Sequence, residues 1–116
     1  MILPFELDRP LAFLDLETTG LSTTSDRIIE LALIRVSPQG DVLERVRRFN
    51  PGIPISPEAT RVHGITDEDV QDKPPFSARA RSLAELLSPC DLAGFNIRRF
   101  DLPMLMAELK RSRVPF

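Results

Sequence analysis

Three strand-like segments follow one another in the first half of the chain, joined by short connections. They span Leu11 to Glu17, Arg27 to Val36 and Val42 to Phe49, and they are rich in the aliphatic residues that strands favour. The second is apolar on both faces, whereas the third alternates and is predicted to have one wetter face. Consecutive strands with short connections pair antiparallel, so the chain is constrained to a three-stranded meander onto which everything else must pack.

Helix signals dominate the second half of the chain. Ser56-Pro57-Glu58 predicts one helix start, and Thr66 to Asp69 predicts another with a variant of the capping box. Apolar spacing predicts an amphipathic helix over residues 76–88, a short buried strand from Asp91 to Asn96, and a last helix from about Phe100 to Arg113. This order of elements predicts an α/β domain with a mixed sheet. The inward positions of the two longer helices are predicted to be Phe76, Ala80, Leu83, Leu87, Phe100, Met104, Leu105 and Leu109.

Composition bounds the domain and its setting. The 116 residues are 42% hydrophobic and 28% charged, which fits one small globular domain, and the net charge of −2 argues against coating long duplexes by charge alone. The single cysteine, Cys90, excludes an internal disulfide and is expected to be a small buried filler. Residues Met1 to Pro10 lack a basic leader, and no segment reaches the ~20 apolar residues of a membrane helix. A cytoplasmic protein without membrane contact is therefore expected.

Asp15 and Glu17 lie at the end of the first strand and carry the first chemical signal. Residues i and i+2 of a strand project from the same face, so the two carboxylates stand side by side. Like charges next to so apolar a strand repel each other unless a cation neutralises them, and hard oxygen ligands suit Mg²⁺ or Mn²⁺. A frayed, solvated strand end is an equally good explanation of these two residues taken alone.

Two further segments combine polar residues with turns. Asn96 follows the short strand and Asp101 lies near the start of the last helix, where the carboxyl ends of neighbouring strands could bring Asp101 opposite Asp15 and Glu17. As single residues, Asp101 is more simply explained as a helix cap and Asn96 as a turn residue. His63, the only histidine, precedes a helix-ending Gly64 and is more often a helix-dipole partner than a functional group in such a place.

Together these segments resemble the successive motifs of the DEDD superfamily of 3′–5′ exonucleases. The motifs are Phe13 to Gly20 (FLDLETTG), Val62 to Thr66 (VHGIT) and Asn96 through Asp101, in the family's order and spacing. Within the superfamily, the match is closest to relatives of the proofreading epsilon subunit of bacterial replicative DNA polymerase and of RNase T. The resemblance implies a ribonuclease H-like fold and two-metal hydrolysis of a terminal phosphodiester.

The resemblance also implies roles for individual residues. Asp15, Glu17 and Asp101 would be catalytic and would bind two Mg²⁺ or Mn²⁺ ions. The 3′ end of a single-stranded nucleic acid, DNA by expectation, would be the partner, with a DNA polymerase or repair complex as a further one. Arg98 and Arg99 would contact phosphates or form a solvated pair. The substrate-binding residues would be Thr18, Thr19, Gly20, Val62, His63, Asn96 and Phe100.

One part of the family pattern is not found in these residues. The third signature, a His or Tyr followed by a fourth metal-binding Asp, does not occur after Asp101, and the sequence has no Tyr. We therefore expect residues 1–116 to be the N-terminal part of a single exonuclease domain, weakly active or inactive alone. The alternatives are a non-catalytic fragment that binds nucleic acid or protein, and a ribonuclease H-like enzyme that cuts internally.

The short strand from Asp91 to Asn96 carries the last expectation. A ribonuclease H-like sheet normally has a further strand after the last helix, so this strand is expected at an exposed edge of the sheet. Exposed edges present unpaired backbone groups. We therefore expect dimerisation along this edge, unless loops or the Pro115-Phe116 tail cover it.

Overall fold

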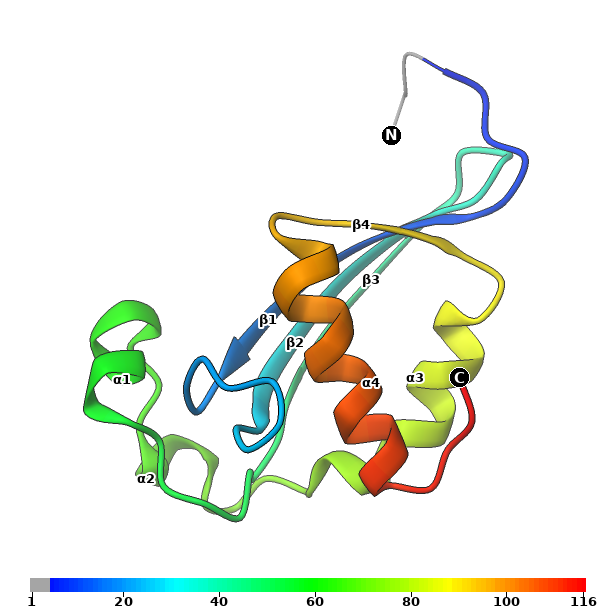
Figure 1. Cartoon of the computed structure of the whole chain (residues 1–116). Coiled ribbons are helices and arrows are strands. Elements are labelled where there is room, and N and C mark those ends of the chain that lie inside the picture. Colours follow the sequence, from blue (N-terminus) through cyan, green and yellow to red (C-terminus); the bar gives the residue numbers. More distant parts are fainter. Residues whose placement is uncertain (1–4) are drawn as a thin grey trace.

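The computed structural model describes residues 5–116 and shows a mixed four-stranded sheet with its longer helices on one face (Figure 1). The strand order is β3-β2-β1-β4, antiparallel except for the β1–β4 pair. This arrangement confirms the predicted α/β fold. The strands are β1 (Leu11–Thr18), β2 (Ile28–Val36), β3 (Val42–Arg48) and β4 (Asp91–Ala93). The helices are α1 (Pro57–His63), α2 (Asp67–Val70), α3 (Ala80–Leu87) and α4 (Leu102–Arg111), with a 3₁₀ turn η1 (Phe76–Ala78) and a π-helical turn η2 (Ile97–Asp101).

The larger core cluster lies on the face of the sheet that α3 and α4 cover, and a smaller one joins β2 to the α1–α2 segment through Ile29, Ile55, Ile65 and Val70. Alternate residues of β1 (Ala12, Leu14 and Leu16) are buried in one cluster with Leu87 of α3 and Leu105 of α4. The predicted inward residues of both helices are buried as expected, except Phe100, which is partly buried. Cys90 is buried too, as predicted. Because side chains alternate along a strand, the intervening residues of β1 point to the face that α3 and α4 leave uncovered.

The register of the meander places charged residues in a row on that uncovered face. Glu17 of β1 lies opposite Glu30 of β2, and Glu30 lies opposite Arg48 of β3. Asp15 lies opposite the small Ala32. The third strand differs from its prediction, because six of its seven residues are exposed and neither face is dry. A strand at the outer edge of the sheet with no helix above it has nothing to bury against.

The chain turns away from the sheet earlier than predicted after β4. This strand ends at Ala93 instead of Asn96, and Asn96 adopts a left-handed conformation with φ of 57°. Gly94 lies against β1 so closely that a Cβ atom there would be 2.5 Å from the Leu14 carbonyl oxygen. The short β4 pairs with Leu11–Phe13 alone, and η2 contacts β1.

The helix boundaries also differ in detail from those predicted. The helix predicted over residues 76–88 divides into η1 and α3, and the last helix begins as η2 and ends at Arg111, not Arg113, whose φ is +58°. The predicted caps are confirmed at Ser56, in the Thr66–Asp69 capping box and at Gly64, which has φ of 77°.

The expectations about edges and membranes can be compared with the described residues. Within residues 5–116, β4 pairs with β1 alone and so lies at an edge of the sheet, as predicted. Dimerisation along this edge stays a prediction. No helix in the same stretch is long and apolar enough to span a membrane. The leaderless start of the chain includes residues 1–4, which lie outside the described part.

Candidate active site

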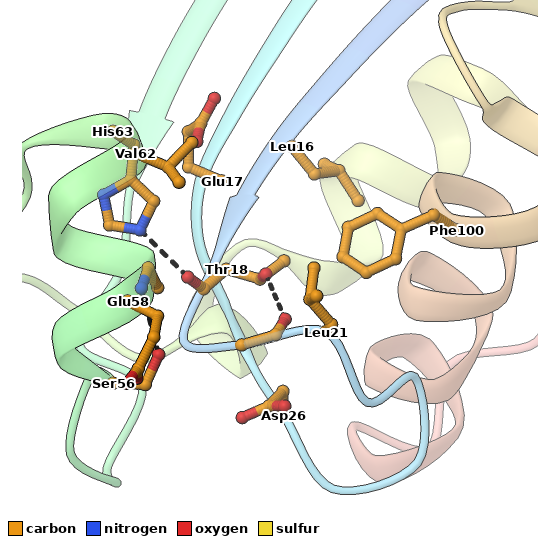
Figure 2. Close-up of a pocket in the computed structure, with 12 residues that line it drawn as sticks. Leu16, Glu17, Thr18, Leu21, Asp26, Ser56, Glu58, Val62, His63 and Phe100 are labelled. Atoms are coloured by element: carbon orange, nitrogen blue, oxygen red, sulfur yellow. Dashed lines mark hydrogen bonds between the residues drawn. The ribbon is translucent and has the colours of Figure 1, made fainter.

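A cleft of about 480 Å³ opens at the end of β1, between α1 and η2 (Figure 2). Leu16 and Phe100 form one wall, and Val62 and His63 of α1 form the other. Glu17 and Thr18 lie between them on β1. The remaining lining residues are Gly20, Leu21, Asp26, Ser56, Glu58 and Ala59. The cleft therefore combines apolar walls with acidic side chains, including Glu17, at its base. Such a site can enclose a flat apolar group and orient the polar part of the same ligand.

His63 fastens α1 to the end of β1. Its Nδ1 accepts a hydrogen bond from the Ile65 backbone N–H at 3.1 Å, so this nitrogen carries no proton. The proton of the neutral ring is therefore on Nε2, which donates to the Thr18 carbonyl oxygen at 3.1 Å. Because both ring nitrogens are engaged with the backbone, His63 shapes the cleft and has no free nitrogen to act as a base or bind an ion.

Replacing His63 with alanine is expected to lower the free energy of unfolding by about 2 kcal/mol. The substitution leaves the Thr18 carbonyl and the Ile65 N–H without their partner, and Ile65 is buried. The matched control is Arg61→Ala on the same helix, because Arg61 pairs at 3.6 Å with Glu58 and both are exposed. Equal denaturant midpoints for the two variants would contradict the role assigned to His63.

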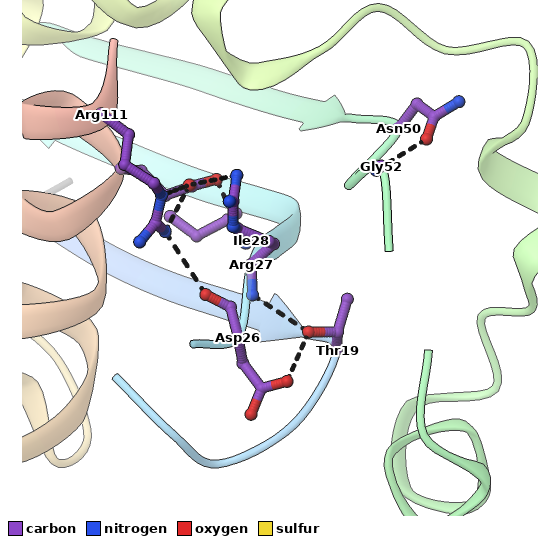
Figure 3. Close-up of polar contacts among 8 residues, drawn as sticks. Thr19, Asp26, Arg27, Ile28, Asn50, Gly52 and Arg111 are labelled. Carbon is purple, nitrogen blue, oxygen red and sulfur yellow. Dashed lines mark hydrogen bonds and ion pairs between the residues drawn. The ribbon is translucent and has the colours of Figure 1, made fainter. Parts of the chain in front are cut away.

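The loop after β1 is held by the Asp26 carboxylate (Figure 3). One oxygen accepts from the Thr19 hydroxyl at 2.8 Å and the other from the Ser22 N–H at 2.9 Å. Thr19 is 1% exposed and its hydroxyl also accepts from the Arg27 N–H at 3.0 Å. A Cβ atom at Gly20 would lie 2.5 Å from the Asp26 carboxylate, so a larger residue there would displace that carboxylate from its hydrogen bonds. These contacts fix the loop that borders the cleft.

Glu108 of α4 connects this loop to the helix layer. It is 4% exposed and accepts two hydrogen bonds from the Arg111 guanidinium, at 2.6 and 3.0 Å. Arg111 also donates to the Asp26 carbonyl oxygen at 3.3 Å, and Arg27 lies 3.9 Å from Glu108. The charge of the buried carboxylate is thereby compensated, and α4 is fastened to the loop beside the cleft.

The three predicted metal carboxylates differ in burial but influence one another. Asp15 is exposed, Glu17 is partly buried and Asp101 is 4% exposed. Burial, and then the negative charges of Asp15 and Glu17, raise the pKa of Asp101 to about 6 from its ordinary 3.8. Burial and the charge of Asp15 likewise raise the pKa of Glu17. The three groups thus share one electrostatic environment in which each negative charge disfavours the others.

The donor set suits a hard divalent cation in type and charge. Asp101 stands at the cap position of α4, yet its carboxylate makes no capping hydrogen bond, which argues against the simple cap explanation. Its oxygens are therefore available to a ligand, and a cation would offset the repulsion from Asp15 and Glu17. Within residues 5–116, however, no three acidic, His or Cys side chains are gathered closely enough to enclose an ion. Convergence of the three on one metal site stays a prediction.

The structure places five of the seven predicted substrate-binding residues in the cleft and two outside it. Thr18, Gly20, Val62, His63 and Phe100 line it, whereas Thr19 turns inward to Asp26, and Asn96 lies in an exposed turn away from the cleft. Arg98 and Arg99 are exposed on η2. The sequence reasoning missed Asp26 and Glu108. The signal for Glu108 was its place among Met104, Leu105 and Leu109 on the buried side of the helix.

Comparison with known proteins gives a family and a set of relatives. The family model for RNase T, described as "Exonuclease", matches residues 12–115. The PolC-type DNA polymerase III of Bacillus subtilis (strain 168) is 36% identical over 98 residues, which cover 84% of this chain and 7% of that protein. The PolC-type DNA polymerase III of Streptococcus pyogenes serotype M2 is 30% identical over 102 residues, covering 87% and 7%. The chain therefore spans about 7% of the length of these curated relatives.

Solved structures share the fold. E. coli Exonuclease I in complex with a dT13 oligonucleotide superposes with a TM-score of 0.82 at 24% identity, over 92% of this chain and 25% of that one. An ExoI/SSB-Ct complex superposes equally well, over 93% of this chain and 25% of that one at 24% identity. This likeness confirms the ribonuclease H-like architecture predicted from the motifs.

Proposed function

The chain belongs to the RNase T exonuclease family of the DEDD 3′–5′ exonuclease superfamily, and we propose that it acts on the 3′ end of single-stranded DNA. The observation that carries the proposal is the cleft at the end of β1, where apolar walls adjoin the carboxylate of Glu17. We propose a replication or repair setting in the cytoplasm, supported by the relatives that are DNA polymerases.

The cleft fits a terminal nucleoside. Phe100 presents a ring to it and faces Leu21 and Leu16, so a base can stack against the ring and be enclosed by aliphatic side chains (Figure 2). The Thr18 hydroxyl donates to the Gly20 carbonyl oxygen at 2.6 Å, which leaves the hydroxyl oxygen of Thr18 free to accept from the 3′-hydroxyl of the terminal sugar. Glu17 directly precedes Thr18 on β1, so the phosphate of the terminal nucleotide would come next to the acidic residues.

Asp15, Glu17 and Asp101 would hold the divalent cations, Mg²⁺ or Mn²⁺, with two ions as in two-metal nucleases. When bound, such ions activate water and stabilise the departing oxygen. The chain's own contribution is to orient the strand end: the walls of the cleft hold the base, and the His63 contact to the Thr18 carbonyl fixes the end of β1. Asp101 is 4% exposed, so bulk water has little access to it.

Turnover by these 116 residues is expected to be weak. His63 is the single histidine, and both of its ring nitrogens are committed to backbone contacts, so the described residues include no free histidine to take up a proton. The competing proposal is a module that binds a strand end without cleaving it. The absence of a gathered three-residue metal group within residues 5–116 favours this second reading.

An assay with end-labelled oligonucleotides tests the proposal. With Mn²⁺ and a high protein concentration, single strands labelled at the 5′ end should shorten one nucleotide at a time when the 3′ end is free, and should stay intact when it is blocked. Tight binding of free ends without shortening would support the binding module. Cleavage of blocked strands would overturn the exonuclease proposal in favour of internal cutting.

A further inference from the structure

A second concave surface lies at the end of β3, away from the cleft. It encloses about 360 Å³ and is lined by four basic residues, Arg47, Arg48, Lys73 and Arg79, and by the acidic Glu30. We call it the β3 groove. Such a concentration of positive charge stands out on a protein whose net charge is −2, and it marks the groove as a site for anions.

Three of the four cations in the β3 groove have no acidic partner. Arg48 forms an ion pair with Glu30, at 3.0 Å between Nε and Oε1. Within residues 5–116, Arg47, Lys73 and Arg79 take part in no ion pair, and Arg47 donates only to the Val46 carbonyl oxygen, at 3.0 Å. Three like charges around a concave surface repel one another, and a bound anion relieves that repulsion.

Backbone contacts hold the far wall of the β3 groove in place. Asn50, two residues after β3, donates its N–H to the Pro74 carbonyl oxygen at 2.9 Å and its side-chain amide to the Gln71 carbonyl oxygen at 3.1 Å. The Lys73 N–H donates to the Val70 carbonyl oxygen at 3.1 Å. Lys73 is therefore carried by a segment tied to the end of the sheet, and the groove is preformed.

The β3 groove passes around the edge strand β3, because Glu30 and Arg48 lie on the face that carries the catalytic candidates whereas Arg47, opposite the core residue Leu31, points to the other face. β1 and β3 run in the same direction with β2 between them, so both end at the same end of the sheet. Glu17, Glu30 and Arg48 lie side by side across these strands, and two strand spacings correspond to roughly 10 Å. A single strand with its 3′ end at Glu17 can cross this row and reach the groove within a few nucleotides.

We infer that the β3 groove binds backbone phosphates of the single strand upstream of its 3′ end, through Arg47, Lys73 and Arg79. The inference rests on the proposed function, because the row that joins Glu17 to the groove is what favours a nucleic acid over an acidic protein. Arginine and lysine contacts to phosphates are independent of base sequence, so the groove lengthens the footprint without adding sequence preference.

The test compares two double variants in strand binding. Arg47→Ala with Lys73→Ala removes two exposed cations of the groove, and the control, Arg9→Ala with Lys110→Ala, removes two exposed cations elsewhere. Fluorescence anisotropy in EDTA measures binding of a thymidine dinucleotide, which is too short to span the roughly 10 Å from Glu17 to the groove, and of an oligothymidylate of about twelve nucleotides, which falls within the length of a small single-strand site. For the longer strand, the groove variant should bind about tenfold more weakly than the control, with a salt slope smaller by about 1.4. The shorter strand should bind both variants equally.

Each other outcome overturns the inference. Equal affinity of the two variants for the longer strand removes the β3 groove from the binding site while leaving the 3′-end function intact. If binding of a poly-glutamate peptide depends on Arg47 and Lys73 and binding of the strand does not, the groove is a site for an acidic protein. Failure of the wild-type protein to bind any strand would overturn the inference and the proposed function together.

Discussion

Replacing Asp101 with asparagine is expected to make the protein more stable at pH 8, by about 3 kcal/mol. Burial and the charges of Asp15 and Glu17 hold the pKa of Asp101 at about 6 instead of 3.8, so its ionised form is disfavoured in the folded state. Between pH 3.8 and about 6, the Asp101 carboxyl is more protonated in the folded protein than in the unfolded chain. The free energy of unfolding therefore falls as the pH rises through this range. Above about pH 6, the folded protein carries the whole cost of the ionised Asp101.

The gain from Asp101→Asn should accordingly depend on pH. Asparagine cannot ionise, so the difference in unfolding free energy between variant and wild type should be largest at pH 8 and close to zero at pH 4. Denaturant titrations at the two values measure it, with Asp72→Asn as the control for an exposed carboxylate. A gain of the same size at both values, or a loss of stability at pH 8, would show that Asp101 is not under charge repulsion.

Replacing Asp15 with asparagine is expected to weaken Mn²⁺ binding at least about a hundredfold, which corresponds to about 2.7 kcal/mol. Asp15 is exposed on the uncovered face and its charge acts on both Glu17 and Asp101, so it links the three carboxylates that would hold the cation. Calorimetric titration of EDTA-treated protein measures the affinity. Hydrolysis of free-ended single strands should be lost together with the metal.

The control for this variant is Asp41→Asn, which neutralises an exposed carboxylate in the turn before β3. Removing the charge of Asp15 should also lower the pKa of Asp101, because that charge is one of the causes that raise it. The pH dependence of unfolding in Asp15→Asn should therefore be shallower than in wild type, independently of any metal. If Asp15→Asn and Asp41→Asn bind Mn²⁺ equally, the assignment of the metal site is wrong.

Local patterns predicted the parts of the site that depend on neighbouring residues in the chain. The alternation of β1 placed Asp15 and Glu17 on one face, and capping patterns located the start of α1 and its end at Gly64. In each case, the residues that form the pattern lie within four positions of the residue whose place they predict. The buried faces of α3 and α4 were predictable for the same reason, since helical spacing is a local property.

Contacts between distant segments could not be predicted in this way. Taken alone, His63 was expected to act on its own helix, and the resemblance made it a substrate-binding residue. Its ring joins Thr18 to Ile65, and Thr18 is 45 residues away. Thr19 was expected to bind substrate, but Asp26 and the Arg27 N–H take up its hydroxyl. Neither contact has a signature in composition or spacing, because it arises only when the loop after β1 closes against α1 and β2.

The π-helical turn of η2 has a consequence for the evolution of the protein. Such a turn carries one residue more than an ordinary helical turn, and in η2 that residue lies ahead of Asp101. Deleting one residue from η2 would convert it to regular α-helix. The turn that precedes η2 would then be rotated by roughly 100° relative to α4. Arg98 and Arg99 are exposed, so replacing them costs the fold little stability. The number of residues in η2 is therefore more constrained than the identity of its exposed residues. We expect related proteins to differ in η2 by substitution more often than by insertion or deletion.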